Sequence, residues 1–438
     1  MNKKTVNVGI IGYGVVGCGT VENLMENADI IRSRTGFNIV VKGVADLNID
    51  RKSDKYIDNI QIKTKNADDL INDPDIDIIV ELIGGYGAAK TFILKAINAG
   101  KHVVTANKAL LAVHGKEIFA LAEEKKVTLG FEASVGGGIP IIRVMKEDLA
   151  ANNIQEIYGI INGTANYILT RMTKEGKAFD EVLKDAQEKG YAEADPTFDV
   201  EGIDTAHKIC LLSSIAFSTV IPFDKIFVEG ISNIKPVDIE IAKELGCTIK
   251  LLAVAKKDHE GMEVRVHPTI IPNSNMLASV NGVFNAVCLT GDRVGTTMHY
   301  GRGAGGAATG SAVAGDIINI ARSINSGCTS QVPVLGFIDG QDDVSLRSIE
   351  DITSCFYMRL MVVDAPGVLA KVGSVLAANG ISVSSALQRE KDPGSRYVPL
   401  VFMTHETKGY NIMAASDEID KLDVTAEKSV VIRVEGER

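Results

Sequence analysis

Tryptophan is absent from this sequence of 438 residues, and aromatic residues make up only 5% of it. Such a chain has few rings on which sugars or unpaired bases could stack, so binding of polysaccharide or single-stranded nucleic acid is not expected. Glycine is abundant instead, with 42 residues that fall in clusters. Clustered glycines let the backbone approach a ligand closely, which favours an α/β protein.

An excess of positive charge is lacking as well, because 46 Lys and Arg residues face 56 Asp and Glu residues, a formal net charge of −10. We therefore expect no general attraction to nucleic acid or to an anionic membrane. No apolar run reaches the roughly 20 residues of a membrane span, and no signal peptide precedes the first strand-like run. Together these features predict a cytoplasmic protein.

Closely spaced cysteines are also missing, since the chain has no CxxC pair and no spacing typical of a metal site. The six cysteines are Cys18, Cys210, Cys247, Cys288, Cys328 and Cys355. This distribution predicts reduced thiols rather than a disulfide framework.

The first 145 residues alternate predicted strands with predicted helices. The strands are expected at 5–11, 38–45, 75–83, 101–105 and 127–131, and the helices at 15–25, 88–98 and 114–124. This alternation with short connections predicts a Rossmann-type, doubly wound parallel sheet over residues 1–145.

Residues 146–326 mix both kinds of element and are predicted to form an α+β catalytic or dimerisation domain. Helices are expected at 179–189, 203–217 and 236–245, and strands at 250–255, 263–269 and 285–290. The segment 301–326 begins GRGAGG and continues as a helix of small residues. We expect this helix to pack back against the first domain.

The C-terminal part is predicted to be a separate module. Residues 327–354 are polar and weakly patterned, which indicates a linker. Within 355–438, strands are expected at 355–363, 381–388, 398–404 and 429–434, with helices at 367–379 and 410–420. The order βαββαβ is the ferredoxin-like plan.

The strongest motif is a glycine turn formed by Gly12, Gly14 and Gly17 between the first strand and the first helix. Glycines at this spacing allow a tight turn, the approach of a pyrophosphate to the backbone, and close packing of helix on strand. The sequence therefore predicts a dinucleotide site at the start of this helix.

Asp46 ends the second predicted strand, where an acid commonly hydrogen-bonds the ribose of a dinucleotide. An acid there also repels a 2′-phosphate, which favours NAD, whereas Arg51 and Lys52 nearby could serve such a phosphate. The alternative is a solvated carboxylate at a strand end, and the choice between NAD and NADP stays open.

Two further positions lie where ligands of such sheets bind. Lys108 follows the carboxyl end of the fourth predicted strand, although most lysines at such places are simply solvated. Glu132 is followed by the glycines of the loop 136–138, whose carbonyl oxygens could hold a hard cation. A flexible hinge between domains is the equally plausible alternative for this loop.

The segment from Gly190 to Lys208 is the richest in candidate groups, with the carboxylates of Glu193, Asp199 and Asp204. Asp204 and Lys208 are four residues apart, so they share one helical face. The rest of that helix is apolar, which indicates burial, and a buried lysine held by a carboxylate can serve as a proton donor. A plain surface ion pair is the alternative.

The stretch DAPGVLA at 364–370 closes a strand and opens the helix of the C-terminal module. A helix start offers unpaired N–H groups to an anionic or zwitterionic molecule. A turn with a helix cap and no ligand is the alternative.

Together these segments resemble homoserine dehydrogenases of the long monofunctional type with a C-terminal ACT domain. The resemblance covers essentially the whole chain and rests on IGYGVVGCGTVENL, DIIVELIGG, GKHVVTANKALLA, FEASVGGGIPII, INGTANYIL, GYAEADPTFDVEGIDTAHK, GRGAGG and DAPGVLAKV, which occur in the family's order. It implies the reversible, NAD(P)H-dependent reduction of L-aspartate 4-semialdehyde to L-homoserine in the biosynthesis of threonine, methionine and isoleucine. It also implies regulation by an amino acid, with threonine as the expected effector, and a homodimer or homotetramer.

The same resemblance implies roles for individual residues. Lys208 would donate the proton, with Lys108 near both nicotinamide and substrate, and Glu193, Asp199 and Asp204 would bind the substrate. The cofactor set would comprise Gly12, Gly14, Val15, Val16, Gly17, Ala45, Asp46, Lys108, Gly190 and Gly303. Glu132 with carbonyls of Val135, Gly137 and Ile139 would hold a monovalent cation, usually sodium.

One departure and two rival functions accompany the resemblance. Many relatives carry an arginine where this chain has Ala45, so a preference for NADP is not assured. A non-catalytic nucleotide or amino-acid sensor would need a degraded catalytic segment, yet the lysines and carboxylates are present. An aspartate-semialdehyde dehydrogenase would need a nucleophilic cysteine, and no cysteine lies in such a setting.

Overall fold

The computed structural model describes residues 5–327, 332–340, 345–389 and 396–436. The chain divides into two compact units. The first comprises Met1–Ile161, Asp204–Lys225 and Phe284–Val344, and the second comprises Asn162–Ile203, Ile226–Val283 and Ser345–Arg438.

The first unit contains a sheet of six strands in the order β3-β2-β1-β4-β5-β6. The strands are β1 (Thr5–Ile11), β2 (Asn38–Ala45), β3 (Ile62–Thr64), β4 (Ile78–Glu81), β5 (His102–Thr105) and β6 (Leu129–Gly130), and all are paired in parallel. Strand β1 lies between β2 and β4. From β1 the chain runs outward through β2 and β3 on one side and then returns to β4 on the other, so the strand order reverses beside β1. A ligand of such a sheet binds at the carboxyl ends of the strands near this reversal.

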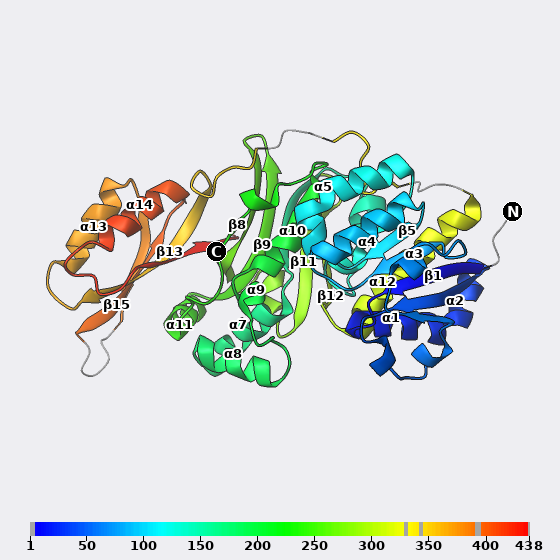
Figure 1. The fold of residues 1–438 in the computed structure, drawn as a ribbon. Helices are drawn as coiled ribbons and strands as arrows, with labels where there is room; N and C mark the ends of the chain where they lie inside the picture. Colours follow the sequence, from blue (N-terminus) through cyan, green and yellow to red (C-terminus); the bar gives the residue numbers. More distant parts are fainter. Residues whose placement is uncertain (1–4, 328–331, 341–344, 390–395, 437–438) are drawn as a thin grey trace. The chain divides into compact units, whose positions relative to one another are not determined.

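Helices cover both faces of this sheet. Helix α1 (Val15–Glu26) packs on one face over a core that includes Val8, Ile10 and Val80, all fully buried. Figure 1 shows α4 (Gly87–Asn98) and α5 (Lys108–Lys125) on the opposite side. The shorter helices of this region are α2 (Ala28–Thr35), α3 (Asp68–Ile71) and α6 (Ile141–Arg143), with 3₁₀ turns at Ile49–Arg51, Ile57–Asn59 and Glu132–Ser134 and a π turn at Val144–Asp148.

Helix α12 (Gly306–Ser326) lies against α1, far from it in sequence. The approach is so close that a Cβ atom on Gly19 would come within 2.3 Å of the Gly306 carbonyl oxygen, and one on Gly310 within 2.6 Å of the Gly19 carbonyl carbon. Only residues without a side chain fit at this crossing, which joins the GRGAGG segment to the helix that starts at the glycine turn.

The first unit also holds an antiparallel group formed by β7 (Ile154–Ile160), β11 (Phe284–Gly291) and β12 (Gly295–Arg302), in which β11 pairs with both neighbours. Helix α10 (Ile203–Ala216) is buried along nearly its whole length, and a 3₁₀ turn follows at Phe223–Lys225. This burial is what the apolar composition of the segment 203–217 predicts.

In the second unit, β9 (Cys247–Asp258) and β10 (Gly261–Pro272) form a long antiparallel hairpin, and β8 (Phe227–Val228) runs parallel to β10. The helices are α7 (Gly163–Glu175), α8 (Phe179–Glu188), α9 (Thr197–Val200) and α11 (Pro236–Glu244), with a 3₁₀ turn at Met276–Ser279.

The C-terminal module belongs to the same unit and has the strand order β17-β13-β15-β14. Its elements are β13 (Thr353–Val363), α13 (Val368–Ala378), β14 (Val383–Gln388), β15 (Tyr397–Thr404), β16 (Thr407–Lys408), α14 (Gly409–Ile419) and β17 (Val430–Val434). The last strand also pairs in parallel with β10, with Arg433 opposite Thr269. The sheet of the C-terminal module is therefore hydrogen-bonded, through β17, to strand β10 of the hairpin.

The predicted fold class is confirmed: a parallel Rossmann-type sheet, a mixed α/β region and a βαββαβ module. The sequence did not predict the longer elements α2, β7, α7 and β12, nor the short ones β3, α3, α6, α9, β8 and β16. The strand expected at 75–83 is shorter, because Asp75 lies in a turn and the carboxylate of Asp77, just before β4, accepts a hydrogen bond from the Asn7 N–H. The predicted boundaries after 145, 326 and 354 stay predictions.

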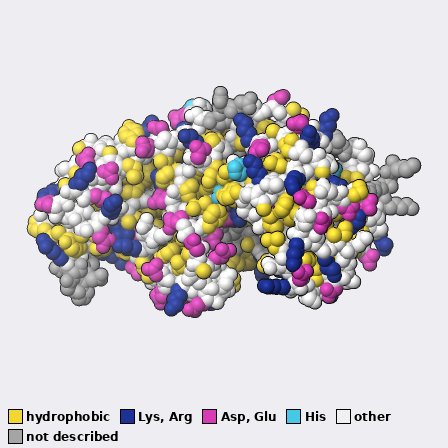
Figure 2. All heavy atoms as spheres, viewed as in Figure 1, with side chains coloured by type: hydrophobic (Ala, Val, Ile, Leu, Met, Phe, Trp, Pro, Cys, Tyr) yellow, Lys and Arg dark blue, Asp and Glu magenta, His cyan; other side chains and the backbone are white. Residues whose placement is uncertain are grey.

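The surface and the thiols agree with the composition. On the face drawn in Figure 2, basic and acidic side chains are interspersed rather than gathered by sign. Within the described residues, Cys18, Cys210, Cys247, Cys288 and Cys355 are free thiols, while Cys328 lies outside those residues. No helix in the described part of the chain has the length and apolarity to cross a membrane.

Candidate active site

Two lysines of the first unit share one carboxylate. Asp204, in the first turn of α10, lies 2.5 Å from the Lys208 ammonium and 3.1 Å from that of Lys108. Lys208 also donates a 2.7 Å hydrogen bond to the Ile161 carbonyl. Asp204 and Lys208 are 4% and 8% exposed, whereas about a third of the Lys108 side chain is open to solvent. A buried pair of this kind costs desolvation, which is typical of groups kept for function.

Lys108 is placed by a chain of hydrogen bonds at the end of β5. It is the first residue of α5, which the side chain of Asn107 caps by accepting from the Leu110 N–H. The Asn107 N–H donates to the Thr105 hydroxyl, which in turn donates to the fully buried carboxylate of Glu81. These bonds fix the first turn of α5, and with it the lysine, at the carboxyl edge of the sheet.

The glycine turn has the geometry that a dinucleotide requires. Gly12 has a φ of +104°, and a Cβ there would lie 2.8 Å from the backbone of Leu82. A Cβ on Gly17 would lie 2.2 Å from the Gly12 carbonyl oxygen, while one on Gly14 would meet nothing within 4 Å. The first and third glycines thus permit the turn, and the second leaves open space at the N-terminus of α1. That space fits a pyrophosphate.

Asp46 and Ala45 hold the glycine turn from the end of β2. The Asp46 carboxylate accepts from the N–H groups of Tyr13 and Asn48, each at 2.8 Å. The Ala45 carbonyl accepts from the Gly12 N–H, and its side chain is buried. Each carboxylate oxygen has a further lone pair, so Asp46 keeps acceptor capacity for a ribose hydroxyl. Ala45 contributes backbone to this site.

The remaining candidates of the cofactor set lie close to the same helix start or in the second unit. Val15 and Val16 are the first residues of α1, with Val15 75% exposed. Gly303 packs on Gly137, where a Cβ on the latter would come within 2.6 Å of the Gly303 carbonyl. The GRGAGG segment and the loop 132–139 therefore touch within the first unit.

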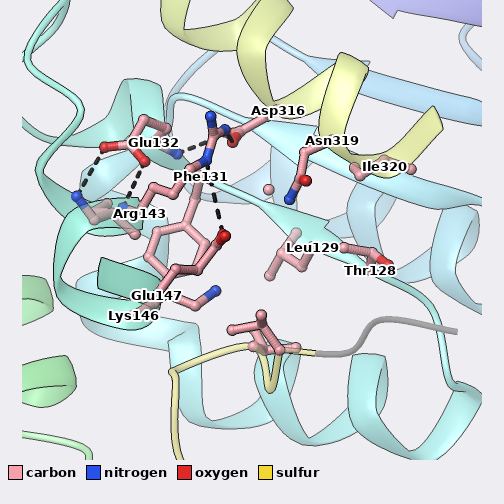
Figure 3. A pocket seen from close by; sticks show the side chains of 14 residues that line it. Thr128, Leu129, Phe131, Glu132, Arg143, Lys146, Glu147, Asp316, Asn319 and Ile320 are labelled. Carbon is pink, nitrogen blue, oxygen red and sulfur yellow. Dashed lines mark hydrogen bonds and ion pairs between the residues drawn. The ribbon is translucent and has the colours of Figure 1, made fainter. Parts of the chain in front are cut away.

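The predicted cation loop is organised around a buried carboxylate, as Figure 3 shows. Glu132 is 4% exposed and accepts from the N–H groups of Ile142 and Arg143, both at 2.8 Å. Its own N–H donates to the carboxylate of Asp316 on α12, which also lies 3.3 Å from the Arg143 guanidinium. These groups border a cavity of about 40 Å³.

The electrostatics of Glu132 fit a nearby cation. Burial, reinforced by the neighbouring charge of Asp316, raises the pKa of Glu132 to about 7. Among the described residues, no Lys or Arg lies within ion-pair distance of it. No three His, Cys, Asp or Glu side chains of the described chain gather as a metal site, so a cation here would need backbone oxygens. The carbonyl of Ile139 already accepts from the Ile141 N–H and retains a second lone pair.

The other predicted site residues lie in the second unit. Gly190 follows α8 with a φ of +73°, and Glu193 is exposed. Asp199, on α9, accepts a 2.7 Å hydrogen bond from the side chain of Asn162, which also caps α7. Within the described residues no hydrogen bond or ion pair joins Glu193 to Asp199, so the structure places them in one segment without bringing their carboxylates together.

Three supporting residues were missed from the sequence: Glu81, Asn107 and Asp316. An acid that ends a buried strand, as Glu81 does in DIIVELIGG, is a usable signal, and so is an Asn directly before a helix. Asp316 gives no such signal, because its partner Glu132 lies far away in the chain.

A parallel doubly wound sheet with a glycine turn and a lysine–carboxylate cluster defines a dinucleotide-dependent oxidoreductase. Family models match homoserine dehydrogenase, NAD binding domain, over residues 12–132, homoserine dehydrogenase over 140–318, and ACT domain over 357–415. The chain belongs to the homoserine dehydrogenase family. It is accordingly an NAD(P)-dependent oxidoreductase that interconverts L-aspartate 4-semialdehyde and L-homoserine, and the sensor and aspartate-semialdehyde dehydrogenase alternatives are not favoured.

Individual relatives agree. The chain is 46% identical to a homoserine dehydrogenase of Pseudomonas aeruginosa over 99% of both chains. It is 45% identical to the crystal structure of a homoserine dehydrogenase from Thiobacillus denitrificans, with a TM-score of 0.93 and coverage of 99% and 98%. A hyperthermophilic archaeal homoserine dehydrogenase in complex with NADPH is 27% identical, with a TM-score of 0.61, over 72% of this chain and 97% of that one.

Proposed function

We propose that Lys208 is the proton donor of the dehydrogenase reaction and that Lys108 stabilises the same oxygen. The observation that carries this proposal is the carboxylate of Asp204 placed between the two ammonium groups. Reduction of an aldehyde builds negative charge on its oxygen, and an ammonium group stabilises that charge and supplies the proton.

A nicotinamide cofactor, when bound, supplies the hydride. The chain's own residues position the reacting groups: Asp204 provides the counter-charge that a buried ammonium requires, and the Ile161 carbonyl fixes the direction of Lys208. Glu193, Asp199 and Asp204 are proposed to bind the substrate, and carboxylates are the natural partners of its ammonium group. In the reverse reaction Lys208 accepts the hydroxyl proton of homoserine.

The cofactor set is proposed to be Gly12, Gly14, Val15, Val16, Gly17, Ala45, Asp46, Lys108, Gly190 and Gly303. We propose that NAD is used at least as well as NADP, because Asp46 directly follows β2 and Ala45, the last residue of that strand, offers no positive charge to a 2′-phosphate. The burial of the Glu132 carboxylate, which forms no ion pair with a Lys or Arg among the described residues, supports a sodium ion held by that residue with carbonyls of Val135, Gly137 and Ile139.

Regulation and assembly are proposed on the C-terminal module. Threonine is the proposed effector, at the start of α13, where Gly367 caps the helix with a φ of +88°. We further propose a cytoplasmic homodimer or homotetramer, without nucleic-acid or membrane partners.

The experiment that tests the proposed function is the oxidation of L-homoserine by the purified chain with NAD and NADP in parallel. Each series is run in sodium and in choline chloride, with and without threonine. The proposal expects turnover with NAD at least equal to that with NADP, activation by sodium and inhibition by threonine. A strict requirement for NADP would overturn the assignment of Asp46.

A further inference from the structure

A cavity of about 320 Å³ lies in the second unit beside the last strand of the C-terminal module. Its apolar lining residues are Phe227, Ile349, Met413 and Val431, and its charged ones are Glu229, Glu350 and Arg433. Its described lining belongs to β8 and the residues after it, the segment 349–350, α14, and β17 with the residue before it, and does not include α13. Its volume is in the range of pockets that hold small molecules, about 300–1,000 Å³.

Arg433 gives this cavity a buried positive charge. Its side chain is only 7% exposed, and its guanidinium lies between the rings of Phe227 and Phe356, 4.9 and 5.8 Å from their centroids. Within the described residues its single hydrogen bond is a long one, 3.4 Å, to the carboxylate of Glu229. A guanidinium has five N–H donors, so this one retains donors for an anion.

Glu229 places a negative charge beside that guanidinium and is 38% exposed. Burial raises the pKa of Glu229 and lowers that of Arg433 to about 10, so neither charge is fully compensated by the other. A polar pair left in this state on a cavity wall is typical of binding sites. The cavity thus offers a cation and an anion side by side next to apolar surface.

We propose that this cavity binds a free α-amino acid with an aliphatic side chain. An α-amino acid carries its carboxylate and ammonium groups on one carbon, which matches the adjacent charges of Arg433 and Glu229. The carboxylate binds the guanidinium, the ammonium binds the Glu229 carboxylate, and the aliphatic side chain covers Val431 and Met413.

Glu229, which lines the cavity, is close in the chain to residues that contact the segment of Asp199. The Glu229 N–H donates to the Val266 carbonyl, and two residues later the Ile231 N–H donates to the Val200 carbonyl. Between them Gly230 packs so closely on Val200 that a Cβ would lie 2.6 Å from its carbonyl oxygen. Val200 directly follows Asp199, and through these contacts we infer that an amino acid in the cavity changes the position of this carboxylate. This regulatory consequence rests on the substrate role proposed above for Asp199.

The test is calorimetric titration of the full-length chain with L-leucine. Glu229→Gln removes the negative charge at similar size and should weaken binding at least about tenfold, since it deletes a hydrogen bond between charged groups. Glu427→Gln is the matched control, because it breaks an exposed ion pair, with Lys235 at 2.8 Å, outside the cavity. It should bind leucine within about twofold of the unaltered chain.

Two analogues make the test independent of any variant. On the unaltered chain, 4-methylpentanoate, which lacks the ammonium, and 3-methylbutylamine, which lacks the carboxylate, should each bind at least about tenfold more weakly than leucine. Absence of leucine binding, equal binding of either analogue, or equal binding by Glu229→Gln would overturn the proposal.

Homoserine oxidation by the same preparation separates the two proposals. Leucine should change the KM for homoserine, and binding without any such change would overturn the coupling to Asp199. A preparation that binds leucine but does not oxidise homoserine would contradict the proposed function and leave the binding site standing. A preparation that oxidises homoserine but does not bind leucine would overturn the binding site and leave the proposed function standing.

Discussion

Asp204 is the residue on which the geometry of the lysine cluster depends. Its two carboxylate oxygens face different lysines, at 3.1 Å from Lys108 and 2.5 Å from Lys208. Because Asp204 and Lys208 are buried, removing the carboxylate would leave an ammonium without its counter-charge. The residue is therefore expected to act through the lysines that it positions.

We expect Asp204→Asn to lower kcat by about 100-fold, a typical effect when an oriented catalytic group is released. The Kd for NADH should stay within about twofold, since the glycine turn is untouched. Steady-state kinetics and fluorescence titration measure the two quantities. Asp195→Asn is the control, because this carboxylate lies in the same segment, is exposed and accepts only from Thr197. If Asp195→Asn lowered kcat as much as Asp204→Asn does, the role assigned to Asp204 would be contradicted.

Lys250 is a second buried lysine, and its partners are neutral. It is 2% exposed and donates to the carbonyl of Val280 at 2.6 Å and to side-chain oxygens of Asn281 and Asn166. Burial, with a smaller contribution from Lys174, lowers its pKa to about 8. An unfolded lysine keeps its proton to about pH 10.4, so the unfolded chain binds more protons between these values and stability rises with pH.

The unaltered chain should therefore gain stability relative to Lys250→Met as the pH rises. The difference between their free energies of unfolding should change by about 2 kcal/mol, in favour of the unaltered chain, from pH 7 to pH 9.5. Urea titrations at the two pH values measure this difference. Lys243→Met, at an exposed position on α11, should show no such shift. A Lys250→Met difference that is the same at both pH values would show that Lys250 does not titrate in this range.

At the scale of elements, the crossing of α1 and α12 lies beside the glycine turn of the proposed cofactor site. Gly19 and Gly310 bring the two backbones into contact, so the GRGAGG segment reaches the start of α1. The position of α1 relative to its sheet, and hence the open space at Gly14, depends on this contact.

Gly19→Ala should lower the free energy of unfolding by about 1–3 kcal/mol, since the added methyl would meet the Gly306 backbone and force a shift of the helices. The KM for NAD should rise with it. Gly373→Ala is the matched control on α13, where a Cβ meets nothing within 4 Å, and it should raise stability by about 0.5–1 kcal/mol. Urea denaturation compares the two. Equal stabilisation by both changes would contradict the close packing.

The sequence predicts those elements whose pattern is local. The strands 5–11 and 38–45 have the bounds of β1 and β2, and α10 ends one residue before its predicted end, because apolar periodicity alone defines them. Strand β12 was missed, since its residues are mostly exposed or half-buried and show no alternation. Helix α5 begins at Lys108 rather than near 114, because its start depends on the cap from Asn107.

The candidate site divides in the same way. The pairing of Asp204 with Lys208 follows from helical spacing, but the contact of Asp204 with Lys108 joins two distant segments and needs the folded chain. The glycine turn is local and predictable, whereas the support of Glu132 by Asp316 is not. Sequence patterns predict contacts between residues that are a few positions apart, whereas contacts between distant segments depend on how the folded chain packs.

At the scale of the whole molecule, the last strand is shared by two parts of the second unit. Strand β17 pairs with β13 of the C-terminal module and with β10 of the hairpin. Directly after it, Glu435 binds Arg265, which is 1% exposed, at 2.6 Å. Burial alone would raise the pKa of Glu435, but Arg265 and Lys256 outweigh it and hold the pKa at about 2.

Glu435→Gln should lower the free energy of unfolding by about 1–3 kcal/mol, because the buried Arg265 loses this charge partner but keeps Glu263 at 3.2 Å. Ending the chain at residue 352 should cost at least as much, since it also leaves β10 without β17. The exposed pair of Glu427 provides the control, and Glu427→Gln should cost less than about 1 kcal/mol. Urea denaturation checks all three. A truncated chain as stable as the full one would contradict this account of β17.

The most direct test of the central claim is the turnover of Lys208→Met. We expect kcat for homoserine oxidation to fall by about 100- to 10,000-fold, the range for loss of a general acid–base group, while the Kd for NADH stays within about twofold. Lys189→Met, at an exposed lysine that pairs with Asp185, controls for loss of charge and should retain its turnover. A kcat of Lys208→Met within about tenfold of the unaltered chain would contradict the assignment of Lys208 as the proton donor.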